Sequence, residues 1–353
     1  MKKVIYIILF IIAIGIILFA YSLFLKNTFE SIFFDLNYTY YPRQEEIIIK
    51  EEIKELNFLF LGDIMLDRSV KKLIDAKGLD YLLKNIEAEN FFEGYDLISA
   101  NLEGPVTNNG DHYPPVAGID FAFSPDDVNE LKRYNFNFFT IANNHLTDQG
   151  LKGVEEARAN LNELGINYVG CSDAEVSECS STILEINDYQ VGMLGLSMVY
   201  HNFDLEKVIS EINKLKDQTD YIITNIHWGV EYTHYFNTYQ QNIAHALIDN
   251  GVDIIIGHHP HVVQGIEIYN KKPIFYSLGN FIFDQYFSSE TQEGLGIGIT
   301  LDNSSYNIYL FPYVTVNKYS ELLKGQDREE FLANYLEWSE GEIEINNGLI
   351  HLD

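Results

Sequence analysis

The sequence predicts an α/β or α+β fold, a sheet-rich domain flanked by helices and preceded by one N-terminal transmembrane helix. Three observations lead to this prediction. Residues 4–25 carry no charge, and from residue 57 short apolar runs alternate with helical stretches as in βαβ units. Beyond residue 262, extended segments follow one another directly. The chain is 46% hydrophobic, which is too apolar for a disordered protein despite its charge.

The N-terminal apolar run predicts a membrane anchor. At 1.5 Å per residue, a helix over residues 4–25 reaches about 33 Å, enough to cross a bilayer core of about 30 Å. The alternative is a cleaved signal peptide, whose apolar region is usually only ~7–15 residues long. Lys2 and Lys3 favour a cytoplasmic N-terminus. We therefore expect a single-pass cell-membrane protein with a cytoplasmic tip at 1–3, an anchor at 4–25, a stalk at 26–55 and an extracytoplasmic domain at 56–353.

Local signals place the elements of the domain. Ser124 can cap a helix that begins at Pro125, and Gly165 and Gly251 are typical of helix C-termini. Asn187 and Asp188 indicate the turn of a hairpin. In chain order we expect strands at 58–61, 95–101, 137–142, 166–170, 221–226 and 253–256, a hairpin over 181–197, extended segments at 262–277, 295–301 and 306–316, and helices at 79–92, 151–164, 239–250 and 328–339.

Charge and cysteine content exclude several classes of protein. The formal net charge is −29, which argues against nucleic-acid binding and against a polybasic membrane-surface protein. Only two cysteines occur, Cys171 and Cys179, so a disulfide scaffold and a four-cysteine zinc module are both excluded. An extracytoplasmic location permits a disulfide between them, but free thiols are equally compatible with the sequence.

Polar residues suited to metals follow five of the expected strands. In open α/β sheets, ligands bind beyond the carboxyl ends of strands. Each residue alone has an ordinary explanation, such as a turn former, a solvated loop acid or a buried histidine. Three imidazoles within four residues, directly after an apolar strand, match no common packing need and favour a metal site. The residues at the five positions are Asp63, Glu103, Asn144-His145, His227 and the run His258-His259-x-His261.

A mixed set of carboxylate, amide and imidazole groups suits one or two ions of Mn²⁺, Zn²⁺ or Fe rather than Ca²⁺ or a thiolate site. Such a centre makes hydroxide available at neutral pH and polarises the oxygen under attack. The sequence therefore predicts a hydrolytic divalent-metal site.

Six motifs occur along the chain in this order: FLFLGDIMLDR, SANLEGPVT, TIANNHLTDQG, NIHWGVEY, GHHPHVVQGIEIY and KKPIFYSLGNFIFDQ. In this order and spacing they resemble the bacterial CapA/PgsA family, the poly-γ-glutamate capsule-synthesis accessory proteins. The match runs from about Asn57 to Asp284. The resemblance implies the β-sandwich flanked by helices of the calcineurin-like metallophosphoesterase superfamily. It also implies poly-γ-glutamate or a related anionic polymer, and membrane-bound polymer synthase subunits, as partners.

The resemblance also implies roles for individual residues. His145 would orient substrate or stabilise charge without binding metal. The pocket would be lined by residues that lie in or beside the same motifs: His258, Glu231, Asn280 and Asp284. The metal ligands would be Asp63, Glu103, Asn144, His227, His259 and His261.

The sequence departs from the superfamily pattern at one position. The first motif is normally Asp-x-His, and here Met65 takes the place of the histidine. A thioether is a poor ligand for a hard hydrolytic metal. One of two metal sites would then be weak, or completed by Asp67 or His258. This departure keeps two hypotheses open: a metal-dependent hydrolase, and a non-catalytic module that binds a polyanion or scaffolds the synthase.

Overall fold

The structure is a computed structural model of the chain, and it describes residues 14–15, 17–23, 55–302, 305–316 and 318–352. The chain divides into two units, residues 1–52 and 53–353, and each is described by itself. In the first unit, residues 14–15 and 17–23 are helical with exposed side chains. Across the described ranges, no helix is both long and apolar enough to cross a membrane. Most of the expected anchor at 4–25, and the expected stalk up to residue 54, lie outside the described residues.

The first of two sheets is mixed and has its parallel strands on one side. Strand β1 pairs in parallel with β2, β2 with β3 and β3 with β4, whereas β12 pairs with β1 in antiparallel fashion. The order is β14-β13-β12-β1-β2-β3-β4, with β11 also beside β1 and β15 beside β13. The strands are β1 (Leu56–Ile64), β2 (Leu97–Leu102), β3 (Phe136–Thr140), β4 (Asn167–Val169), β11 (Asn280–Ile282), β12 (Glu293–Asp302), β13 (Ser305–Val316), β14 (Tyr319–Leu322) and β15 (Leu349–Leu352).

The second sheet has the order β5-β6-β7-β8-β10-β9. Its central strands β6, β7, β8 and β10 run parallel, and an antiparallel strand closes each edge. The carboxyl ends of β7 and β8 therefore lie at one edge, as do those of β1 and β2 in the first sheet. The strands are β5 (Ser181–Ile186), β6 (Tyr189–Ser197), β7 (Tyr221–His227), β8 (Ile254–His258), β9 (Val263–Tyr269) and β10 (Lys272–Leu278).

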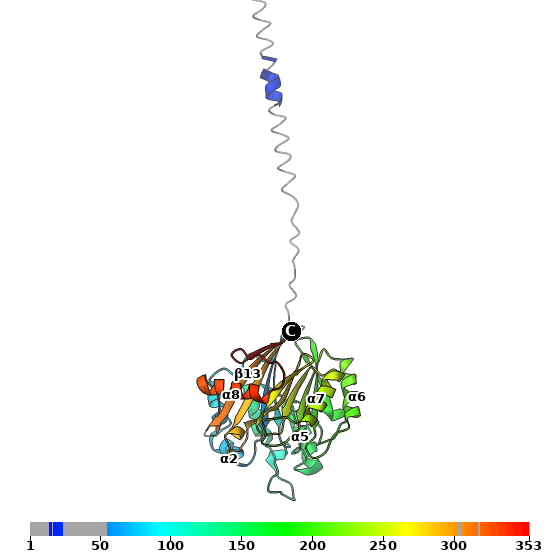
Figure 1. The fold of residues 1–353 in the computed structure, drawn as a ribbon, viewed down its shortest axis with the longest axis vertical. Coiled ribbons are helices and arrows are strands. Elements are labelled where there is room, and N and C mark those ends of the chain that lie inside the picture. Colours follow the sequence, from blue (N-terminus) through cyan, green and yellow to red (C-terminus); the bar gives the residue numbers. More distant parts are fainter. Residues whose placement is uncertain (1–13, 16, 24–54, 303–304, 317, 353) are drawn as a thin grey trace, which may run out of the picture. The chain divides into compact units, whose positions relative to one another are not determined.

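The two sheets form a sandwich with helices on both outer faces (Figure 1). One apolar cluster fills the space between the sheets, where Phe58 and Phe60 of β1 meet Ile254 and Ile256 of β8. A second cluster joins the outer face of the first sheet to α2 (Arg68–Lys77), α3 (Asp80–Glu87), α4 (Pro125–Leu131) and α5 (Gly150–Leu164). A third joins the second sheet to α6 (Leu205–Lys216) and α7 (Thr238–Asn250). Helix α8 (Gly325–Trp338) contributes to the central cluster.

The mixed α/β architecture expected from the sequence is confirmed, with corrections to single elements. Helices α2 and α6 were not expected, and the extended segment 262–277 is two strands, β9 and β10, that turn at Asn270 and Lys271 with positive φ. The expected helix start is confirmed, because the Ser124 hydroxyl accepts from the Asp126 amide at 3.3 Å. Cys171 and Cys179 form a disulfide within the segment that connects β4 to β5.

One close backbone approach brings the first acid into place. A Cβ atom on Gly62 would lie 2.0 Å from the carbonyl oxygen of Gly279, so only glycine fits at this position. The approach lets β1 pair with β11, and it sets Asp63 opposite Asn280. Gly62 thus allows Asp63 to lie next to strand β11.

Candidate metal centre

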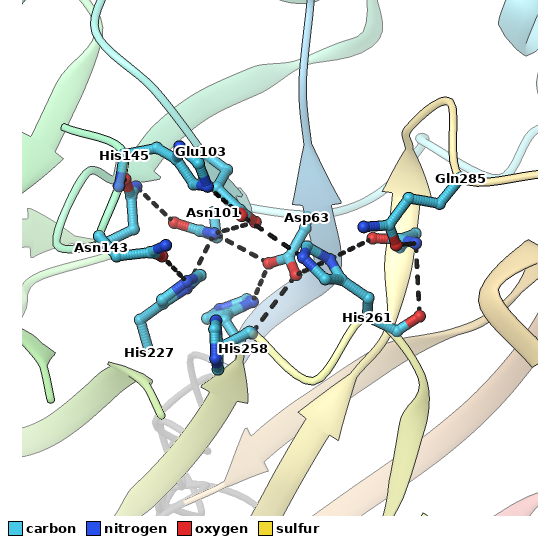
Figure 2. Close-up of polar contacts among 12 residues, drawn as sticks. Asp63, Asn101, Glu103, Asn143, His145, His227, His258, His261 and Gln285 are labelled. Carbon is cyan, nitrogen blue, oxygen red and sulfur yellow. Dashed lines mark hydrogen bonds and ion pairs between the residues drawn. The ribbon is translucent and has the colours of Figure 1, made fainter. Parts of the chain in front are cut away.

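Three acidic and imidazole side chains from both sheets meet at the carboxyl edge of the sandwich. Asp63 lies near the end of β1, Glu103 directly follows β2, and His227 ends β7. One ligand atom from each lies within 4.8 Å of the others, and all three residues are buried. Figure 2 shows these side chains pointing toward one another. The sequence placed these residues at strand ends, and the fold brings those ends together.

Asn101 lies at the middle of this group and was not among the site residues expected from the sequence. Its Nδ2 amide donates to Asp63 Oδ1 at 2.8 Å and lies 3.4 Å from Glu103 Oε2 and 3.2 Å from His227 Nδ1 (Figure 2). Its Oδ1 accepts from Asn143 Nδ2 at 3.1 Å. Since side chains alternate along a strand, Asn101 and Glu103 share one face. In the sequence, the only indication of this role was that Asn101 stands two residues before Glu103, so that both side chains point to the same face.

Three histidines at and just after the end of β8 lie around Asp63. His258 Nδ1 lies 3.2 Å from Asp63 Oδ1, and the His259 backbone amide donates to Asp63 Oδ2 at 3.4 Å. His261 lies between the two acids, with Nδ1 3.6 Å from Asp63 Oδ2 and Nε2 3.7 Å from Glu103 Oε1. The ring centroids of His259 and His227 are 4.9 Å apart. His259 and His261 both have positive φ, 102° and 57°, a backbone conformation that concentrates at functional sites.

Burial and neighbouring charges shift the pKa values of these groups in different directions. It raises the pKa of Glu103 well above its usual value, and the neighbouring Asp63 raises it further. Burial also acts to raise the pKa of Asp63, but the hydrogen bond and charge of His258 and the charge of His261 outweigh it, so that pKa is lowered. Burial and the other histidines lower the pKa of His227 well below its usual value, that of His259 to about 4, and that of His261 as well. These three imidazoles are therefore neutral at pH 7, the form that ligates metals.

Several buried atoms of the group have no hydrogen-bond partner among the described residues. They are Oε1 of Glu103, Nε2 of His258 and Nδ1 of His259. A buried polar atom left unpaired costs about 1–3 kcal/mol. A divalent cation would satisfy carboxylate oxygens and neutral imidazole nitrogens together, so the donor set fits the metal that the sequence predicts. We name Asp63, Glu103, His227, His258, His259 and His261 the ligand cluster.

Asn144 and His145 lie beside the ligand cluster in different ways. Asn144 Oδ1 lies 2.8 Å from His227 Nε2. His145 Nδ1 lies 2.7 Å from Asp148 Oδ2, and its Nε2 lies 3.9 Å from Glu103 Oε1. The Phe121 ring lies against the His145 imidazole, with centroids 4.4 Å apart. His145 thus faces the cluster without joining it.

A cavity of about 480 Å³ lies beside the ligand cluster, and His261 is the cluster member that lines it. His145 and His261 form part of its wall, and two of the residues expected in the pocket, Glu231 and Asp284, also line it. The other two do not. His258 is buried against Asp63 inside the ligand cluster, and Asn280, whose Oδ1 lies 3.0 Å from His261 Nδ1, supports the cluster from behind.

Met65 packs into the apolar core under the first sheet and is fully buried. Its sulfur accepts from the Asp67 amide at 3.1 Å. The Asp67 carboxylate caps α2 through the Arg68 amide at 2.5 Å and also accepts from the Ala122 amide at 3.0 Å. Of the two replacements considered for the missing histidine, the structure places His258 beside Asp63 and commits Asp67 elsewhere.

Comparison with known proteins agrees with the motifs. The family model described as "Bacterial capsule synthesis protein PGA_cap" matches residues 57–285. The "Capsule biosynthesis protein CapA" of Bacillus anthracis is 30% identical over 70% of this chain and 65% of its own length. The "PGA biosynthesis protein CapA" of Bacillus subtilis (strain 168) is 35% identical over 65% of this chain and 64% of its own length. The chain thus spans just under two thirds of each relative.

Among solved structures, the chain is similar to a putative 5′-nucleotidase from Staphylococcus aureus in complex with alpha-ketoglutarate, with a TM-score of 0.43 and 16% identity over 81% of this chain and 59% of that one. The family match covers more than half of the sequence and includes every member of the ligand cluster. The chain belongs to the bacterial capsule synthesis protein family PGA_cap, the CapA/PgsA family that its motifs predicted.

Proposed function

We propose that this chain is a membrane-anchored, extracytoplasmic enzyme that acts on poly-γ-glutamate or a related anionic envelope polymer as a metal-dependent hydrolase or transferase. The observation that carries the enzymatic part is the ligand cluster, a buried group of carboxylates and imidazoles beside a cavity. The polymer is supported by the family and by the relative named for PGA biosynthesis. A buried group of this kind, with unpaired oxygens and nitrogens, is hard to explain as packing alone.

The residues that would hold a divalent ion are the ligand cluster together with Asn144, whose amide oxygen lies 2.8 Å from His227 Nε2. A bound ion of this kind polarises an amide or phosphoester oxygen and stabilises negative charge that develops on it. Asn101 fixes Asp63 through its 2.8 Å hydrogen bond, and Asn143 in turn fixes Asn101. Such outer hydrogen bonds orient ligating groups.

His145 would act on the substrate directly. Because the Asp148 carboxylate accepts from Nδ1, the Nδ1 proton stays there and Nε2 is the atom turned toward Glu103. In the doubly protonated imidazolium form, Nε2 carries a second proton, which it can donate to an oxygen that develops negative charge. Phe121 fixes the plane of the ring from the other side.

We also propose that residues 4–25 anchor the chain and that the domain faces away from the cytoplasm. Lys2 and Lys3 on the short side support this orientation. The Cys171–Cys179 disulfide supports an oxidising compartment. Membrane-bound synthase subunits would be the partners there.

The rival function is a non-catalytic module that grips a polyanion through the metal or scaffolds the synthase. Met65 favours it, because a core methionine leaves the first motif one ligand short. Turnover of poly-γ-glutamate and of a chromogenic phosphodiester, each with and without Mn²⁺ or Zn²⁺, separates the two. Metal-dependent cleavage of either substrate supports the enzyme. Polymer binding without turnover under any metal supports the module.

A further inference from the structure

Arg68 is the only lysine or arginine among the residues that line the cavity. It stands at the start of α2, directly after the capping Asp67, and has a positive φ of 51°. About a third of its side chain, 35%, is exposed, so the guanidinium is open to the cavity although its Nε is buried. Neither the ligand cluster nor His145 uses this charge.

The guanidinium is held on several sides. Its Nη2 pairs with Asp284 Oδ1, while Asp284 Oδ2 accepts from the Ser69 hydroxyl at 2.9 Å and from the Ser69 amide at 3.2 Å. The rings of Phe121 and Phe283 lie 5.0 and 5.9 Å from the Arg68 guanidinium carbon. An arginine fixed by a carboxylate and stacked on aromatic rings loses little conformational freedom when it binds a ligand.

The same two rings connect Arg68 to the mouth of the ligand cluster. Phe121 contacts His145 at 4.4 Å between centroids, and Phe283 contacts His261 at 4.8 Å. Arg68 therefore lies one aromatic ring away from each cluster-side histidine of the cavity. A substrate whose reacting bond is at the cluster would bring its adjacent groups next to the guanidinium.

The charges around the cavity favour an anionic ligand next to Arg68. Glu231 and Asp284 line the cavity as well, so two carboxylates face the single guanidinium of Arg68 there. A metal ion in the cluster reverses the local sign there. An anionic ligand then meets two positive points, the cluster and Arg68, separated by the rings of Phe121 and Phe283.

We propose that Arg68 binds an oxyanion of the substrate, a carboxylate or a phosphate, next to the bond held at the ligand cluster. This inference rests on the proposed function and names its substrate class, a chain that carries a negative group beside the reacting bond. An arginine fits planar oxyanions better than a lysine does, because it presents several N–H groups in a fixed plane.

The ordinary alternative is a clasp in which Arg68 and Asp284 only tie α2 to the segment after β11. The two hypotheses predict different changes in ligand affinity for two substitutions that break the same ion pair. Arg68→Gln removes the proposed anion-binding charge, whereas Asp284→Asn removes a negative charge and leaves the arginine. A clasp predicts the same effect on ligand affinity from both variants. An oxyanion site predicts opposite effects.

The test is calorimetric binding to the Mn²⁺-loaded full chain in detergent, with two probes, a short γ-linked glutamate oligomer and inorganic phosphate. Arg68→Gln is expected to weaken binding about 10- to 100-fold, the effect of one charge-assisted hydrogen bond. Arg68→Lys is expected to fall between, and Asp284→Asn to bind at least as tightly as the unaltered chain. Arg133→Gln is the matched control, because it removes the same charge from an exposed site paired with Asp80 and Glu130. The probe that shows the Arg68 dependence identifies the source of the oxyanion.

Equal loss in Arg68→Gln and Asp284→Asn, or no loss in Arg68→Gln, overturns the inference and leaves the proposed function standing. Absence of binding of both probes to the unaltered, metal-loaded chain overturns the inference and the polymer role together. Metal content measured on every variant shows that the cluster is intact, and thermal unfolding shows that the variant is folded.

Discussion

His145 Nδ1 lies 2.7 Å from Asp148 Oδ2, three residues further along the chain. The pair stands on the loop between β3 and α5, and the carboxylate fixes which edge of the imidazole faces Glu103. The Asp148 carboxylate also accepts from the Phe121 amide at 2.8 Å, so one acid positions both the histidine and the ring that packs on it. The arrangement resembles a positioned proton donor more than a metal ligand.

His145→Ala is therefore expected to retain metal and fold but to lose turnover. One lost charge-stabilising donor typically costs about 10²–10³ in rate. Asp148→Asn is expected to lower the rate by a smaller factor, because the imidazole stays but is no longer fixed by a carboxylate. Metal content, thermal unfolding and kcat on the same preparations check both. If His145→Ala keeps full turnover per folded molecule, the histidine has only a structural role.

Asn101→Ala is expected to affect both stability and metal affinity. It removes the donor to Asp63 and the acceptor of Asn143, and buried groups left unpaired cost about 1–3 kcal/mol. Loss of a hydrogen bond that orients a ligand typically lowers metal affinity about 10- to 100-fold. Asn162→Ala on the exposed side of α5 is the control, with an expected change within ~0.5 kcal/mol. Equal denaturant midpoints and metal affinities in the two variants contradict the role given to Asn101.

The comparison of sequence and structure shows which parts of the site can be predicted. Asp63, Glu103 and His227 were identified because each follows an apolar run, and parallel strands bring such positions to one edge. Asn101 was missed because an asparagine inside a strand has no motif of its own, and its importance comes from contacts across both sheets. Asp148 was missed for a similar reason, since it looks like an ordinary loop acid.

The fold was predictable where periodicity and capping agree. Helix α7 was expected to end at Gly251, and Gly251 closes it with a positive φ of 118°. Helix α2 was missed although Asp67 caps it and Val70 and Ile74 face the core at helical spacing. Its sequence follows directly on the Gly-Asp motif, and no element was expected between that motif and the helix at 79–92. The pairing of β1 with β11, distant in sequence, depends on the close approach of Gly62 to Gly279, which no local pattern predicts.

His259 is expected to contribute to the pH dependence of the free energy of unfolding. Burial lowers its pKa to about 4 in the folded chain, below its ordinary value of 6.5. Between these values the unfolded chain binds more protons, so stability rises with pH from about 4 to 6.5 and this gain is lost on acidification. In chelator-treated protein, His259→Asn is expected to flatten this rise by on the order of 1–3 kcal/mol.

His201→Asn is the control for that experiment, because its side chain is 81% exposed. Denaturant unfolding at several pH values between 4 and 7 gives the slopes. A slope in His259→Asn equal to that of the unaltered chain shows that His259 is not held neutral by burial.

A fragment that begins at Lys54 is expected to fold without the N-terminal segment. All described members of the three apolar clusters lie at Leu56 or beyond. The fragment should be monodisperse and unfold in a cooperative transition followed by circular dichroism. A fragment that begins at Gly62 is the comparison, and it should fail because it lacks most of β1, the strand between β12 and β2. Aggregation of the Lys54 fragment alongside a folded full chain in detergent contradicts this domain boundary.

The central claim is that the ligand cluster is a metal centre, and elemental analysis of the purified Lys54 fragment tests it most directly. His227→Ala and His259→Ala are compared with the control His245→Ala. His245 lies outside the ligand cluster, and its Nε2 is 2.8 Å from Glu267 Oε1. We predict at least about one transition-metal ion per chain, removed by a chelator. We further predict that the two cluster variants lose most of the metal while His245→Ala keeps it. Unchanged metal content in both cluster variants would contradict the assignment of the cluster as a metal centre.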